Sequence, residues 1–182
     1  MLTPRRSLVL NALGLYAVAF VLLAAFALQV LLGELPCPLC LLQRVAFAAL
    51  AVGPVLNIRF GPRPSHYALS LLAALFGAGV AARQILLHIA PGDPGYGSAV
   101  FGLHYYTWAF LCFAAAIAAV AALLLSERQF PAPGEAPPRP GPFERAAVLL
   151  VIAVTLANVA GTFVECGAGV CPDNPVSYRL LP

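Results

Sequence analysis

The chain has 182 residues, of which 62% are hydrophobic and only 9% are charged, and its formal net charge is +3. Ordinary soluble domains carry about 25% charged residues, so this composition excludes a water-soluble globular fold and indicates lipid as the solvent. The modest positive charge comes entirely from arginine, which does not suggest nucleic-acid binding and fits charges that orient membrane spans.

Five segments are apolar and long enough to cross a membrane, because a span needs about 20 apolar residues for roughly 30 Å of hydrocarbon. They run from about residue 8 to 32, 39 to 56, 67 to 89, 105 to 125 and 146 to 164. The first is long, uninterrupted and not followed by a clear cleavage site, which favours a retained helix over a signal peptide. The predicted fold class is all-α, a polytopic transmembrane helical bundle in which residues 1–182 form a single integral membrane domain.

The segments between these spans contain helix breakers, and their arginines set the expected orientation. A short turn follows the second span, a proline- and glycine-rich loop covers residues 126–145 and is expected to be mobile at 131–142, and a polar tail covers residues 165–182. The arginines on one side of the spans are Arg5, Arg6, Arg59, Arg63, Arg128, Arg139 and Arg145. The positive-inside rule makes that side cytoplasmic, so the amino terminus is expected inside and the carboxyl terminus outside.

Five cysteines are present, and four of them form two close pairs. Cys37 and Cys40 lie at the outer end of the second span, and Cys166 and Cys171 follow the fifth span. The predicted topology therefore brings both pairs to the oxidising face, where disulfides persist. Cys112 lies alone inside the fourth span, and a buried lone cysteine usually acts as a small hydrophobic residue.

The first cysteine pair, in Cys37-Pro38-Leu39-Cys40, is expected at the start of a helix, since proline is tolerated in a first helical turn. Backbone N–H groups at that position stabilise a thiolate. Arg44 follows Cys40 by four residues, which places it on the same helix face about 6 Å deeper. Because a charge in lipid is expensive, Arg44 either extends to the headgroups or holds a thiolate and the polar head of a bound molecule.

The second pair, Cys166 and Cys171, encloses two glycines that allow a tight, mobile loop. It is either a plain structural disulfide or an exposed one that exchanges with incoming thiols. A zinc site built from all four thiols is a further alternative. The layout favours a relay, in which electrons enter from a soluble dithiol at the tail pair, pass to the helix pair and leave into a lipid-soluble acceptor.

The end of the first span with Cys37-Pro38-Leu39-Cys40-Leu41-Leu42-Gln43-Arg44 resembles the disulfide bond formation protein B (DsbB) family. The resemblance implies a four-helix core in the inner membrane of a bacterium. The fifth apolar segment adds a transmembrane helix to this core, and the arginine distribution then places the carboxyl terminus in the periplasm. It implies a thiol:quinone oxidoreductase that reoxidises a periplasmic thioredoxin-fold oxidase of the DsbA type. The electrons would pass to a membrane quinone, either ubiquinone or menaquinone.

The resemblance also implies roles for individual residues. Cys37 would exchange with the second pair, Cys40 would contact the quinone ring, and Arg44 would support quinone binding, with no metal required. His88, at the end of the third span, matches a polar patch near the same quinone. Arg83 and the aromatic residues of 101–108 remain open, as interfacial anchors or as parts of the site.

The sequence departs from the family pattern, because familiar members have four spans and carry the second pair between the third and fourth. The segment 91–104 has no cysteine here, and a fifth span delivers Cys166 and Cys171 instead. Their catalytic role therefore depends on topology and analogy. The alternatives are a membrane thiol reductant with the opposite electron flow and a non-enzymatic metal-binding or scaffold protein.

Overall fold

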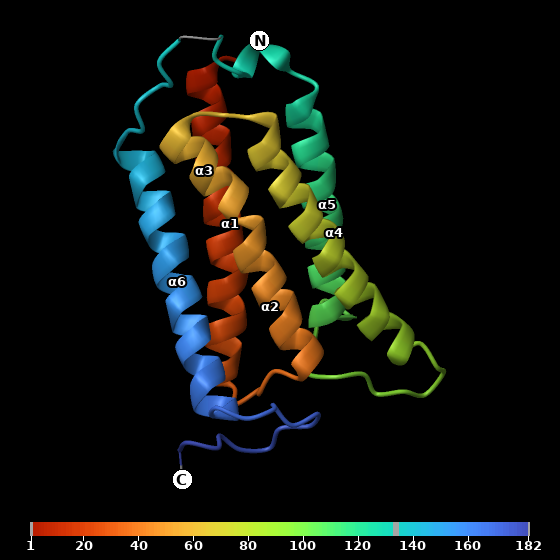
Figure 1. The fold of residues 1–182 in the computed structure, drawn as a ribbon. Helices are drawn as coiled ribbons and strands as arrows, with labels where there is room; N and C mark the ends of the chain where they lie inside the picture. The colour runs from red at the N-terminus through yellow and green to blue at the C-terminus, as the bar shows by residue number, and fades with distance from the viewer. Residues whose placement is uncertain (1, 133–134, 182) are drawn as a thin grey trace.

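A computed structural model of the chain describes residues 2–132 and 135–181, and it is built almost entirely of helices (Figure 1). The helices are α1 (Pro4–Leu31), α2 (Pro38–Leu50), α3 (Val52–Phe60), α4 (Pro64–Leu87), α5 (Tyr105–Leu124), the short 3-10 helix η1 (Glu127–Gln129) and α6 (Pro142–Cys166). A small antiparallel hairpin, β1 (Ala99–Val100) and β2 (Leu103–His104), precedes α5. Within the described residues, five helical segments, with α2 and α3 counted as one, are long and apolar enough to cross a membrane, which confirms the predicted all-α membrane fold.

Prolines mark where four of the long helices begin. Pro4, Pro38, Pro64 and Pro142 each occupy the first helical turn, where the missing N–H costs no intrahelical bond. At the start of α6, the Gly141 N–H donates to the carboxylate of Glu144, three residues on, at 2.8 Å. The residues at the start of each of these helices therefore determine where the helix begins.

The sequence does not predict where the fifth span lies in the bundle. In the structure this span, α6, lies beside α1 (Figure 1). The α2–α3 rod packs on α4, and α4 packs on α5, so α6 and α5 lie on opposite sides of the bundle. The side-chain amide of Asn158 donates to the Leu22 carbonyl at 3.2 Å, and the Tyr16 hydroxyl donates to the Phe143 carbonyl at 3.1 Å. These bonds fasten the fifth span to the first.

The end of the bundle that holds the amino terminus contains a buried polar cluster. Its members are Ser7, Asn11, Asn57, Tyr67 and Gln129, and each is at most 2% exposed. The Tyr67 hydroxyl donates to the Gln129 side chain at 2.8 Å, and the Asn11 amide donates to Tyr67 at 2.9 Å. The cluster ties α1, α3, α4 and η1 together. Residues 133 and 134 of the proline-rich loop and residue 182 of the tail lie outside the described residues.

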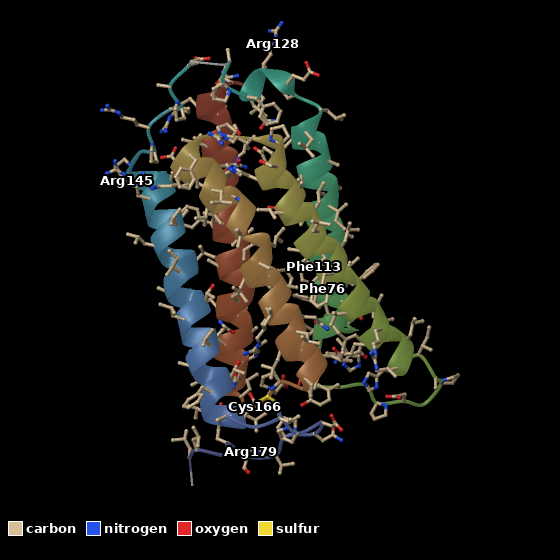
Figure 2. The ribbon with its side chains drawn as sticks, in the orientation of Figure 1. Phe76, Phe113, Arg128, Arg145, Cys166 and Arg179 are labelled. Carbon is tan, nitrogen blue, oxygen red and sulfur yellow. A yellow bond between two sulfur atoms is a disulfide. The ribbon has the colours of Figure 1, made fainter. Side chains whose placement is uncertain are left out.

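Figure 2 shows that the two ends of the bundle differ in character. Arg128 and Arg145 lie at the end with the polar cluster, whereas Cys166 and Arg179 lie at the opposite end. The start of α2, with the first cysteine pair, also lies at the Cys166 end (Figure 1). The two cysteine pairs therefore share one end of the molecule.

A close approach of α3 to α4 gives a stability prediction. A Cβ at Gly53 would collide with the His66 carbonyl oxygen and the Ser70 hydroxyl, whereas a Cβ at Gly79, in α4, would meet nothing within 4 Å. We expect Gly53→Ala to destabilise the protein by about 1–3 kcal/mol, because backbone cannot move aside cheaply. Gly79→Ala is the matched control and should be neutral or slightly stabilising. Thermal unfolding in detergent measures both, and equal melting temperatures would contradict the packing argument.

Candidate active site

The first cysteine pair begins α2, as the sequence predicts. Cys37 is the N-cap of α2, and its sulfur accepts the Cys40 N–H at 3.2 Å. Both thiols are free in the structure, with Cys37 only 6% exposed and Cys40 half-buried. The pair therefore lies at the positive end of a helix, which suits a sulfur that carries negative charge.

The pKa of the Cys37 thiol is raised, first by its hydrogen bond with the Cys40 side chain and then by burial. A thiol with a raised pKa keeps its proton at neutral pH.

Gln84 of α4 contacts both sulfurs, and the sequence analysis did not identify it. Its side-chain amide donates to the sulfur of Cys37 at 3.4 Å and to that of Cys40 at 3.5 Å. The side-chain amide of Gln43 donates to the side-chain oxygen of Gln84 at 2.8 Å, and this bond fixes the orientation of the Gln84 amide. Gln84 is 1% exposed. The sequence signal that could have identified Gln84 is an amide side chain within an apolar span. A buried amide needs hydrogen-bond partners, so such a residue is expected to face other polar groups.

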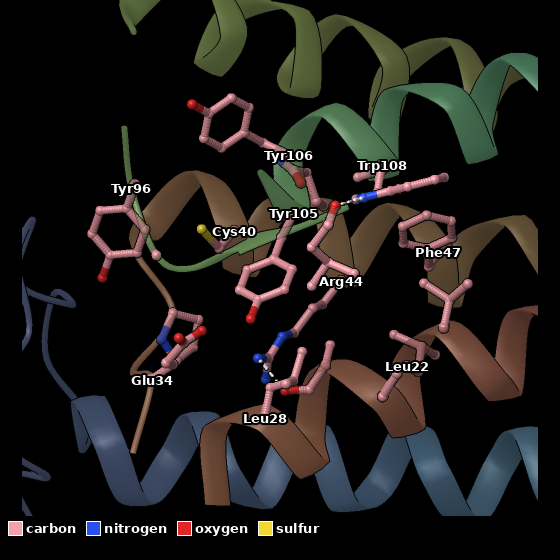
Figure 3. A pocket seen from close by; sticks show the side chains of 18 of the residues that line it. Leu22, Leu28, Glu34, Cys40, Arg44, Phe47, Tyr96, Tyr105, Tyr106 and Trp108 are labelled. Atoms are coloured by element: carbon pink, nitrogen blue, oxygen red, sulfur yellow. Dashed lines mark hydrogen bonds between the residues drawn. The ribbon is translucent and has the colours of Figure 1, made fainter. Parts of the chain in front are cut away.

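A cavity of about 680 Å³ opens beside the pair, between α1, α2, α5 and the segment 96–101 (Figure 3). Its wall includes Cys40, Arg44, Phe47, Tyr105, Tyr106 and Trp108. The predicted aromatic cluster therefore contributes to the cavity as well as to the start of α5. Glu34 also borders it, and the Glu34 Oε2 atom is buried without a hydrogen-bond partner among the described residues.

Arg44 does not extend to the surface but is held between α1 and α6. Its Nη1 donates to the Gln29 side-chain oxygen at 2.6 Å and to Asn158 at 3.3 Å, and its Nη2 donates to the Ala25 carbonyl at 3.0 Å. The guanidinium group is half-buried and borders the cavity. A bound polar group there would meet a cation whose position is already fixed.

The segment before α5 covers the outer side of the pair. The Tyr96 hydroxyl donates to the Leu35 carbonyl at 2.7 Å, and Ser98 donates to the carboxylate of Glu34. Burial raises the pKa of Tyr96, so its hydroxyl stays a donor at neutral pH. The Trp108 indole N–H donates to the Val100 carbonyl at 3.0 Å and holds the hairpin to α5.

Cys166 and Cys171 form a disulfide directly after α6. Cys166 is 3% exposed, whereas Cys171 is half-buried. The tail turns back onto α6, where the Arg179 backbone N–H donates to the Glu165 backbone carbonyl at 3.1 Å. A second cavity, of about 360 Å³, lies between α2 and α6 and is bordered by both tail cysteines and by Arg44. The structure thus brings the tail pair and Arg44 to one small region.

His88 lies apart from the main cavity wall. Its Nδ1 atom is 3.0 Å from the carboxylate of Asp93, and its ring stacks on Tyr106 at 5.6 Å. The Gly95 N–H and His88 both lower the pKa of Asp93. His88 therefore supports the cavity through Tyr106, and Arg83, one residue before Gln84, is exposed.

Metal coordination receives no structural support within residues 2–132 and 135–181. No three or more His, Cys, Asp or Glu side chains are arranged there to hold an ion.

Comparison with known proteins points to one family. The family model described as disulfide bond formation protein DsbB matches residues 5–98. A protein named disulfide bond formation protein B from Xanthomonas axonopodis pv. citri (strain 306) is 45% identical over 86 residues, which cover 44% of this chain and 50% of that protein. One of the same name from Aromatoleum aromaticum is 40% identical over 86 residues, covering 44% and 52%.

The chain spans about half the length of the curated relatives it matches. The family match takes in α1 to α4 with the Cys37–Cys40 motif and ends before α5, so α6 and the tail disulfide lie beyond it. No solved structure matches the chain.

Proposed function

The chain belongs to the DsbB family of disulfide bond formation proteins, and on that premise we propose that it is a membrane thiol:quinone oxidoreductase that generates disulfides. Its thiol donor would be a periplasmic thioredoxin-fold oxidase of the DsbA type, and its acceptor would be ubiquinone or menaquinone. The membrane would be the bacterial inner membrane, with the amino terminus in the cytoplasm and the carboxyl terminus in the periplasm.

One observation supports this proposal above the others: Cys40, one sulfur of a free dithiol, borders an aromatic cavity together with a fixed arginine. The volume of about 680 Å³ suits a small-molecule ligand. Aromatic side chains fit a flat ring, the Arg44 guanidinium fits a carbonyl oxygen, and the apolar surroundings fit an isoprenoid chain. Once bound, a quinone supplies an acceptor for two electrons and two protons.

The residues of the chain would carry out two thiol–disulfide exchanges. A partner thiolate attacks the tail disulfide at Cys171, the more exposed sulfur, and releases Cys166 as a thiolate. The second partner thiol resolves the mixed disulfide, so the partner leaves oxidised and the tail pair is reduced.

The reduced tail pair then attacks an oxidised Cys37–Cys40 pair. Attack on Cys37 restores the tail disulfide and leaves both electrons on the helix pair. Cys40 is the sulfur that borders the cavity.

A redox-state experiment tests the proposal. The full chain in lipid nanodiscs is mixed with a reduced thioredoxin-fold dithiol partner, and its thiols are alkylated with a mass label. Without quinone, both cysteine pairs should accumulate as thiols. Adding short-chain ubiquinone should return them to disulfides and oxidise the partner. Cysteines whose state ignores both partner and quinone would mark the chain as a scaffold and end the proposal.

A further inference from the structure

Glu165 is a buried acidic residue that the two exchanges do not use. It is the penultimate residue of α6, it is 0% exposed, and it directly precedes Cys166. Its Oε2 atom accepts the Gln29 side-chain N–H at 3.1 Å, and its Oε1 atom has no hydrogen-bond partner among the described residues. A buried carboxylate with one open oxygen is costly unless a cation lies near it.

The nearby cation is Arg44, one amide away. Gln29 accepts from Arg44 through its oxygen at 2.6 Å and donates to Glu165 through its nitrogen at 3.1 Å. Cation, amide and carboxylate thus form one chain across α2, α1 and α6. Each hydrogen bond polarises the next in a medium of low dielectric constant.

Arg44 borders both cavities, so its position affects both. The α6 helix holds it twice, directly through Asn158 at 3.3 Å and indirectly through Glu165. The Tyr178 hydroxyl also donates to the Gln29 carbonyl at 3.4 Å, so the tail contacts the middle member of this chain.

We propose that Glu165 is a positioning residue for quinone binding, which holds the Arg44 guanidinium through Gln29 on the wall between the two cavities. This inference rests on the proposed function. The fifth span then does more than carry the tail disulfide, because the same helix end balances the buried charge of the acceptor site. A side chain held in place before binding loses little freedom when its ligand arrives.

The test measures quinone binding without turnover. Trp108 is the only tryptophan in the chain and borders the larger cavity, so its fluorescence should be quenched by bound ubiquinone-1. Glu165→Gln keeps the shape and an acceptor for Gln29 but removes the charge. We expect it to weaken binding by about 3- to 10-fold, the effect of one unfixed side chain.

A charge swap separates positioning from packing. Gln29→Glu combined with Glu165→Gln moves the carboxylate directly onto Arg44 and keeps an amide to bond with it. The swap should restore the dissociation constant to within about twofold of the parent, because the compensating charge is present again. Leu156→Ala is the control on α6, because Leu156 is exposed and borders neither cavity, and it should bind as the parent does.

Each outcome decides the matter. An unchanged dissociation constant in Glu165→Gln, or a folded swap variant that still binds weakly, overturns the inference. If Glu165→Gln does not fold, the swap variant decides alone: folded with parental affinity it supports the inference, and unfolded it assigns Glu165 to packing. A parent protein whose fluorescence ubiquinone-1 does not quench would instead refute the proposed function.

Discussion

Cys40→Ser is expected to lower the rate of quinone reduction by about 10³-fold or more, because loss of a nucleophile that acts as a unit with its partner removes nearly all catalysis. Cys40 is the member of the pair that borders the cavity, and a serine hydroxyl is not ionised at neutral pH. Cys37→Ser should be equally inactive, since no disulfide can then form. The measurement is the absorbance loss of a soluble quinone, driven by a reduced thioredoxin-fold partner.

Cys112→Ala supplies the comparison for these two variants. Cys112 is the third free cysteine among the described residues. It packs against the hydrophobic core from α5 and also borders the larger cavity. As a small hydrophobe it should tolerate alanine with a change in rate of less than about threefold. Normal turnover in Cys40→Ser would reject the assignment of the pair, whatever Cys112→Ala does.

Gln84→Leu is expected to slow turnover by about 10- to 100-fold, because a hydrogen bond to a charged group contributes about 1.5–3 kcal/mol. Leucine fills a similar volume but offers no N–H to either sulfur, so a thiolate on the pair loses the donor that now contacts both. Alkylation of the reduced pair at neutral pH should slow in parallel, since the thiolate is the species that reacts.

The control for Gln84→Leu is Arg83→Ala on the same helix turn, because Arg83 is exposed. It should leave both rates near those of the parent. A Gln84→Leu protein with a parental melting temperature and parental rates would show that the amide serves packing alone.

The features of this structure that depend on short stretches of sequence could be predicted. Span composition, prolines at helix starts and the Cys37–Cys40 spacing are properties of short segments, and they predicted an all-α membrane bundle and a dithiol at a helix start. The position of α6 could not be predicted in this way. Its contacts with α1 use single polar side chains such as Asn158, and a single sequence does not show which helix such a side chain faces.

The same limit explains why Gln84 was not identified from the sequence. Gln84 approaches the sulfurs only because α4 packs on α2, a contact that links residues more than forty positions apart. His88 lies four residues after Gln84, but it ends its helix and pairs with Asp93 outside the cavity wall. The neighbouring helix distinguishes the two positions, and a single sequence does not show which helices pack together.

The polar cluster of Ser7, Asn11, Asn57, Tyr67 and Gln129 has a consequence for bioenergetics. Its hydrogen bonds close the end of the bundle opposite the sulfurs, and lipid offers no water to replace them. The thiols, the acceptor cavity and the protons transferred between them would then all communicate with a single aqueous compartment. Moving one elementary charge across the bilayer involves about 2.3 kcal/mol per 100 mV. A reaction confined to one face moves none, so disulfide synthesis would neither draw on the membrane voltage nor generate it.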